Sequence, residues 1–147
     1  VVFAADGLRA TAGRDDLETA LRAIASRTGA FLAVTDGAQG VLWLEHGALR
    51  RLPAFAVETV DTLGAGDVFH GAFALALAEG RNEAEALRFA CAAAAIKCTR
   101  FGGIAGAPAR REVEAFLAVR RAAPCRRDGA QSRAAADAPA GPLTSRP

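Results

Sequence analysis

The chain of 147 residues contains no methionine and no tyrosine, and it has only one tryptophan. Its first residue, Val1, stands inside an apolar run, so we expect a processed product or a fragment of a longer protein. Long apolar stretches are also absent. None approaches the roughly 20 residues that a transmembrane helix needs. We therefore expect no membrane partner, and residues 1–5 are too few to form a signal peptide.

Cysteine is scarce. Cys91 and Cys98 lie in one predicted helix, and Cys125 lies near the C-terminus. No pair has the close spacing of a metal-binding cysteine motif. We therefore interpret all three as reduced thiols of a cytoplasmic protein.

The sequence also lacks a strong excess of charge of one sign. Its 18 basic and 16 acidic residues give a net charge of +2. Residues 1–121 contain 14 of each sign, so the whole excess belongs to residues 122–147. A neutral body does not provide the basic face that nucleic acids require, so we expect no nucleic-acid partner.

Hydrophobic residues make up 52% of the chain, which is enough for the core of one domain. Apolar residues recur at helical spacing before Gly29, which we expect to cap that helix, and Asn82 is expected to cap a later one. Strands mixed with crossover helices indicate an α/β layered fold. The expected strands are 30–35, 41–45 and 48–55, and the expected helices are 17–28, 68–79, 83–100 and 110–121.

The composition changes from residue 122 onward to alanine, arginine, proline, serine and glycine, with almost no large apolar side chains. Such a segment cannot bury enough surface to fold. The sequence therefore predicts a folded domain at 1–121 and a disordered tail at 122–147.

The segment "VDTLGAGDVF", residues 60–69, carries the chemistry. A Walker loop requires a Gly-Lys pair, which the sequence lacks, and a dinucleotide fingerprint starting at Gly64 would end on Phe69. What remains is a small-residue turn, Gly64, Ala65 and Gly66, before Asp67 and a predicted helix. Free amides and the helix dipole at such a turn attract anions.

Asp67 would repel a resting phosphate, so it is better suited to accept a proton from a hydroxyl that attacks a γ-phosphate. The alternative is that Asp67 caps a glycine-rich turn. The residues alone leave both interpretations open.

Four segments together resemble the C-terminal half of the ribokinase-like sugar kinases, the phosphofructokinase-B (PfkB) family: "AVTDGAQGVLW", "VDTLGAGDVFHGAFALAL", "RFACAAAAIKCTRFGG" and "REVEAFL". The resemblance covers residues 1–121 and implies part of a three-layer (α/β/α) sandwich that is truncated at its N-terminus. It implies ATP-dependent phosphorylation of a sugar hydroxyl. Asp67 would be the general base next to the sugar, and the amides of Gly64, Ala65 and Gly66 would hold the transferring phosphate.

The resemblance also implies a nucleotide site. ATP would lie beside "TDGAQG", which by itself would be interpreted as a hairpin turn. It would also lie beside Cys91, whose alternative is a small core residue. The implied nucleotide-binding residues are Thr35, Asp36, Gly37, Gly40, Gly66 and Cys91.

A bound monovalent cation, potassium, is a further implication of the resemblance. Asp61 would be one ligand, although it could equally fix its own loop by accepting hydrogen bonds from nearby amides. Gly106 stands where some members carry a hydroxyl ligand. The implied ligands are the Asp61 side chain and the backbone carbonyls of Leu63, Cys98, Phe101 and Gly103.

The sequence departs from the family at the magnesium site. The family's N-x-x-E motif, which orders magnesium-bound water, is matched by "AADG", where Ala4 and Gly7 replace both polar residues. Either another group holds that water, or the magnesium site is weakened. Nearby, His70 is expected to be a packed or capping histidine, and Arg100 and Lys97 are expected to be exposed at a helix end.

The N-terminal half of the family is missing from this sequence. That half supplies most sugar-binding residues and a β-sheet lid that often forms a homodimer. The segment "CTRFGGIAGAP" resembles a branch that acts on fructose-type sugars, including sulfofructose-like substrates. The alternatives to a kinase are a non-catalytic nucleotide-binding regulatory module and an inactive fragment.

Overall fold

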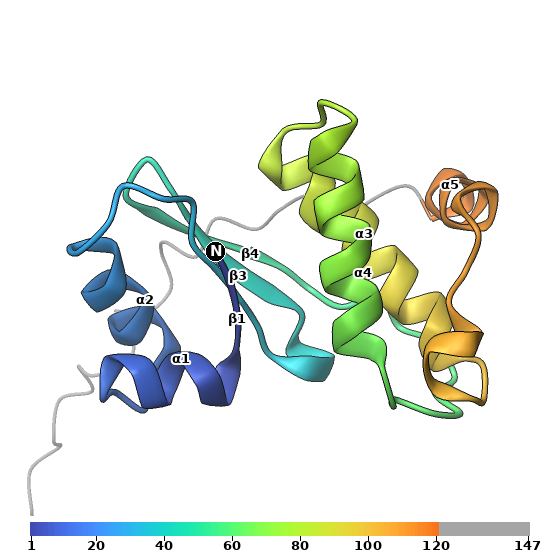
Figure 1. Cartoon of the computed structure of the whole chain (residues 1–147), viewed down its shortest axis with the longest axis horizontal. Helices are drawn as coiled ribbons and strands as arrows, with labels where there is room; N and C mark the ends of the chain where they lie inside the picture. Colours follow the sequence, from blue (N-terminus) through green and yellow to red (C-terminus); the bar gives the residue numbers. More distant parts are fainter. Residues whose placement is uncertain (121–147) are drawn as a thin grey trace, which may run out of the picture.

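The computed structural model describes residues 1–120 of the chain (Figure 1). The expected tail at 122–147 therefore lies outside the described residues. In chain order the elements are β1 (Val2–Ala4), α1 (Ala5–Ala12), α2 (Leu17–Ala25), β2 (Ala33–Thr35), the 3₁₀ helix η1 (Gly37–Gln39), β3 (Val41–Glu45), β4 (Ala48–Leu52), α3 (Ala65–Ala78), α4 (Glu83–Cys98), the 3₁₀ helix η2 (Gly103–Gly106) and α5 (Arg110–Val119).

The four strands form one sheet in the order β1-β2-β3-β4. β1 and β2 are parallel, with Ala4 opposite Thr35, so both strands end at the same edge of the sheet. The other two pairs are antiparallel hairpins. The β3–β4 turn consists of His46 and Gly47, both with positive φ (49° and 78°), the backbone that two-residue hairpins favour.

Helices cover both faces of this sheet (Figure 1). Alternate residues of a strand point to opposite faces, and β2 divides its side chains accordingly. Val34 packs with α1 and α2, in a cluster that includes Leu8 and Leu21. Ala33 packs with α3 and α4, in a cluster that includes Trp43 and Phe73. The predicted α/β sandwich of three layers is confirmed.

Helix ends follow local hydrogen bonds. Asn82 caps α4 as predicted, because its side chain accepts a hydrogen bond from the Glu85 amide at 2.9 Å. The prediction that Gly29 caps the preceding helix is wrong. α2 ends at Ala25, and the amide of Ser26 bonds back to the Arg22 carbonyl at 3.1 Å, so the helix ends before Gly29 is reached.

α5 lies outermost and packs on α4 (Figure 1). Val113 is buried, and Phe116 and Leu117 pack against the same core, which is the apolar face that the sequence predicted. Among the described residues, no helix is long and apolar enough to cross a membrane.

Candidate active site

The turn before α3 depends on glycine at position 64. Gly64 has a left-handed backbone, φ 76°, that other residues adopt only at a cost. A Cβ added there would lie 3.2 Å from the Ile104 nitrogen and 3.3 Å from the Gly103 carbonyl carbon. Gly64 therefore allows the start of α3 to approach η2 closely.

The backbone amides at this turn are unequal. The Ala65 amide already donates to the Thr62 carbonyl at 3.1 Å, and the first α-helical bond runs from the Val68 amide to the Gly64 carbonyl at 3.0 Å. Within residues 1–120, the amides of Gly64, Gly66 and Asp67 have no acceptor. Of the three amides that the sequence assigned to an anion, that of Ala65 is thus already used, whereas those of Gly64 and Gly66 are available.

Asp67 is the third residue of α3 and is exposed. Its carboxylate makes no hydrogen bond or ion pair with any residue of the described chain, and α3 has no side-chain cap. The alternative interpretation of Asp67 as a helix cap is therefore wrong. Asp16, by contrast, does cap α2, because it accepts a hydrogen bond from the Thr19 amide at 2.9 Å.

A mostly apolar cavity of about 290 Å³ opens beside Asp67. Its walls come from α3, α4, η2 and α5, and they include Leu75, Phe89 and Ile104. Arg110 also lines this cavity, but its guanidinium is paired with Glu79 and with Glu114, the latter at 2.9 Å. These pairs largely neutralise the arginine, so the cavity itself offers no free cation for a phosphate.

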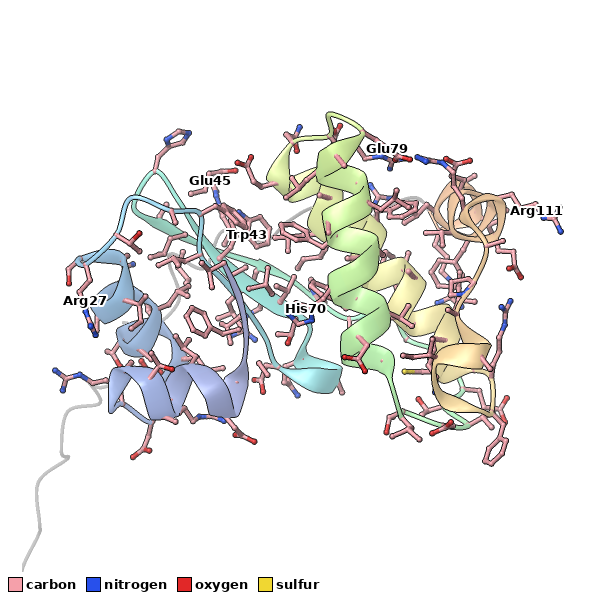
Figure 2. All side chains as sticks on the ribbon, viewed as in Figure 1. Arg27, Trp43, Glu45, His70, Glu79 and Arg111 are labelled. Atoms are coloured by element: carbon pink, nitrogen blue, oxygen red, sulfur yellow. The ribbon has the colours of Figure 1, made fainter. Side chains whose placement is uncertain are left out.

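His70 follows Asp67 by about one helical turn and lies between α3 and the sheet (Figure 2). Its Nδ1 is 2.8 Å from the Gly66 carbonyl, and its Nε2 is 3.4 Å from the Val2 carbonyl of β1. His70 is thus an exposed link between the first turn of α3 and β1, and it is neither the packed nor the capping histidine that the sequence predicted.

The segment 35–40 forms the β2–β3 hairpin turn around η1. The Asp36 amide donates to the Gly40 carbonyl at 2.8 Å, and Gly37 and Gly40 both have positive φ. A Cβ at Gly40 would lie only 2.1 Å from the Leu52 carbonyl oxygen. Thr35 is anchored through its hydroxyl to the Phe3 carbonyl at 3.3 Å. The segment is therefore a tightly fixed hairpin turn.

Figure 1 shows η1 and the start of α3 at the same end of the molecule, where β1 also ends. Neither residues 35–40 nor Cys91, however, lines the cavity at Asp67. Cys91 lies in the core, and burial raises the pKa of its thiol to about 12. The structure favours the interpretation of Cys91 as a small core residue.

Asp61 has surroundings opposite to those of Asp67. Its Oδ1 accepts a hydrogen bond from the Leu63 amide at 2.8 Å, and its Oδ2 accepts bonds from the Gly102 and Gly103 amides at 3.1 and 3.2 Å. The Nζ of Lys97 lies 3.1 Å from the same Oδ2. The amides of Leu63 and Gly103, followed by Lys97, hold the pKa of Asp61 far below its ordinary range.

Lys97 corrects a prediction. The sequence placed it at an exposed helix end, but its side chain is 0% exposed and bonds to Asp61. Arg100 is half-exposed, and its guanidinium pairs with Glu112. That pairing also lowers the pKa of Glu112.

The potassium ligands that the sequence suggested do not fit a free ion. The Asp61 carboxylate receives one donor on Oδ1 and three on Oδ2, so it fixes its own loop, as the alternative interpretation proposed. The Cys98 carbonyl accepts bonds from the amides of Val60 and Asp61 at 2.7 and 3.1 Å. Leu63 and Phe101, whose carbonyls were also suggested as ligands, are exposed to solvent.

For magnesium, Ala4 ends β1 and Gly7 lies in the first turn of α1. Neither residue offers a side-chain ligand, and the neighbouring Asp6 pairs with Arg9 at 3.0 Å. No group of three histidine, cysteine, aspartate or glutamate side chains within residues 1–120 could hold a metal ion. These residues do not fit a protein-held magnesium ion.

Comparison with known protein families shows which family has this sequence. The model of the pfkB family carbohydrate kinases matches residues 1–110, which include the Asp67 turn. This chain belongs to the pfkB family. Among its relatives, the ribokinase of Bacillus subtilis (strain 168) is 49% identical over 88 residues, which cover 60% of this chain and 30% of that ribokinase.

Solved structures show the same fold. The ribokinase of Thermotoga maritima is 40% identical, with a TM-score of 0.75 over 80% of this chain and 41% of that one. The fructokinase of Vibrio cholerae O395, solved with fructose, ADP and calcium, is 30% identical, with a TM-score of 0.72 over 80% of this chain and 40% of that one. A double mutant of that fructokinase was solved with fructose, ADP and a potassium ion. The chain thus spans 30–41% of the length of these relatives.

Proposed function

We propose that this chain is the nucleotide-binding and proton-accepting part of an ATP-dependent sugar kinase. The observation that supports this most strongly is the exposed carboxylate of Asp67 at the start of α3, which has no partner within residues 1–120 and lies among backbone amides that have no acceptor there. Membership of the pfkB family supports the same reaction class, since the relatives of this chain include ribokinases and fructokinases.

In the proposed reaction, a sugar hydroxyl oxygen attacks the γ-phosphorus of ATP. The bond from that phosphorus to the β–γ bridging oxygen breaks, and ADP leaves with the bond's electrons. Asp67 accepts the hydroxyl proton, and the amides of Gly64 and Gly66 stabilise the charge on the transferring phosphoryl oxygens. The helix dipole of α3 adds to that stabilisation.

The proposed nucleotide site includes residues 35–40, whose turn lies at the same end of the molecule as Asp67 (Figure 1). Ala4 and Gly7 provide no side-chain ligand for magnesium, so we assign no magnesium site to this chain. We also propose that residues 1–121 form the nucleotide-binding part and residues 122–147 form a tail. Any homodimer of the parent enzyme would form through segments outside this chain.

Because the chain spans 30–41% of the length of its relatives, the sugar-binding residues are proposed to lie in the rest of the parent enzyme. The isolated chain is expected to phosphorylate no sugar. The parent should be tested with ribose and with fructose, since its relatives include proteins named ribokinase and fructokinase.

The test is Asp67→Asn in the complete parent enzyme. Asparagine keeps the size of the side chain but cannot accept the proton, so kcat should fall by about 10²–10⁴-fold. Binding of ATP should persist, because removing a negative charge near the γ-phosphate does not weaken it. Asp15→Asn, another exposed acid, is the matched control and should leave kcat unchanged. A near-normal kcat in Asp67→Asn would overturn the proposed role.

A further inference from the structure

Lys97 is the only lysine among the 18 basic residues of the chain, and the other 17 are arginines. It lies in the last turn of α4, and its side chain is 0% exposed. Its Nζ donates to the Asp61 backbone carbonyl at 2.8 Å and lies 3.1 Å from the Asp61 Oδ2. The single lysine ammonium of the chain is therefore buried against one residue of the turn before α3.

Those contacts are part of a set that fills one oxygen of the Asp61 carboxylate. A carboxylate offers about four lone-pair positions, and Asp61 already receives four donors. One donor is the Leu63 amide on Oδ1. The other three, on Oδ2, are the Gly102 and Gly103 amides and the Lys97 ammonium. Oδ2 is therefore full, and a cation there would have to displace one of its three donors, whereas Oδ1 keeps one lone-pair position beside the Leu63 amide.

Charge repulsion disfavours a second cation at either oxygen of the Asp61 carboxylate. A buried ammonium without a counter-charge is strongly unfavourable, so Lys97 requires the Asp61 carboxylate. A second monovalent cation at that carboxylate would lie within a few ångströms of the Lys97 charge and would be repelled by it.

We infer that Lys97 provides, from within the chain, the positive charge that a bound monovalent ion would bring to the Asp61 loop, so that this chain needs and binds no such ion there. The double mutant of the Vibrio cholerae fructokinase was solved with a bound potassium ion, so this chain would differ from that protein in whether it binds such an ion.

The position of Lys97 gives this charge a structural purpose. Asp61 joins α4, through Lys97, to the amides of Gly102 and Gly103. Gly103 in turn lies directly against Gly64 at the start of α3. Lys97 is therefore a positioning residue for the turn that carries Asp67.

The first experiment compares thermal unfolding of the full chain in potassium chloride, sodium chloride and N-methylglucamine chloride at equal ionic strength. The wild-type midpoints should agree. Lys97→Met removes the charge but keeps a long side chain, so its midpoint should fall and then recover in a saturable way with potassium. Arg27→Met removes an exposed charge far from α4 (Figure 2) and should show neither effect.

A saturable rise of the wild-type midpoint in potassium would overturn the inference. Failure of potassium to restore a folded Lys97→Met variant would overturn it as well, because the Asp61 loop would then not be a place where a cation acts.

The second experiment does not need the variant to fold. Selective ¹⁵N-lysine labelling of the wild-type chain marks one Nζ, because Lys97 is the only lysine. Its ammonium signal should be protected from solvent exchange and should be unchanged when potassium replaces N-methylglucamine. Loss of protection, or a saturable shift with potassium, would show that an ion competes for Asp61 and would overturn the inference. Neither experiment measures phosphoryl transfer, so the outcome is independent of the proposed kinase function.

Discussion

Asp61 and Asp67 lie in the same short segment but have opposite surroundings. The Asp61 carboxylate accepts bonds from three backbone amides and pairs with a fully buried lysine. The Asp67 carboxylate has no partner within the described chain and stands exposed at the start of α3. An acid that binds four donors of its own chain stabilises a fold, whereas an acid that binds none remains available to a substrate.

The two aspartates are also connected. The amides that bind Asp61 belong to Gly102 and Gly103, and the latter lies directly against Gly64, the N-cap of α3. Asp61 thus helps to position the turn that carries Asp67. A substitution at either aspartate tests these separate roles, because one should change stability and the other should change activity.

The largest effect on stability is expected from Asp61→Asn. The amide side chain has no charge to compensate the buried Lys97 ammonium and accepts fewer of the four donors. Breaking a buried pair on one side is strongly destabilising, so the unfolding midpoint should fall by roughly 10 °C or more. Thermal unfolding followed by circular dichroism measures this. A midpoint equal to that of the wild type would mean that the Asp61–Lys97 pair contributes little.

The glycines between the two aspartates should respond in opposite directions. Gly64→Ala places a side chain on a left-handed backbone and 3.2 Å from the Ile104 nitrogen, so it should destabilise the fold by about 1–2 kcal/mol or more. Gly66→Ala is the matched control. Gly66 lies in the helix with open space around its Cα, so alanine should add about 0.5–1 kcal/mol of stability.

Urea denaturation measures both changes in the free energy of unfolding. In the parent enzyme, Gly66→Ala should also weaken activity despite its greater stability, because the new methyl group obstructs the approach of a phosphate. Equal losses of stability in the two variants would contradict the geometry of the turn.

Sequence reasoning identified the part of this region that depends on local order. The Asn82 cap is a feature of neighbouring residues and was located correctly. The small residues and the acid were also identified locally, but α3 begins at Ala65, so Ala65, Gly66 and Asp67 lie in its first turn and not before it. The layered α/β architecture also followed from the alternation of strands and helices.

Long-range contacts could not be predicted in the same way. Lys97 was expected to be exposed because a lysine near a helix end usually is, and its partner Asp61 is 36 residues away in sequence. α1 was not predicted because only one of its large residues, Leu8, is apolar, and that residue is buried against α2. Gly29 lost its expected role because backbone bonds at Ser26 end α2 earlier.

The smallest effect concerns acid pH. The folded chain lowers the pKa of Asp61 below the ordinary value of about 3.9, mainly through the Leu63 amide. The resulting stability is fully present above that ordinary value and is lost as the pH falls toward the lowered pKa. Asp61→Asn should therefore lose less stability than the wild type between about pH 6 and pH 3. Parallel urea titrations at the two pH values test this, and equal losses would assign the acid sensitivity to other carboxylates.

The most direct test of the division of roles is the single substitution Asp67→Asn, measured for both unfolding and activity. Among the described residues the carboxylate has no partner to lose, so the unfolding midpoint of the chain should stay within roughly 3 °C of the wild-type value. In the complete parent enzyme the same substitution should remove most phosphoryl transfer. A midpoint that falls as far as that of Asp61→Asn, together with a kcat close to wild type, would show that Asp67 is the structural acid and would contradict this account.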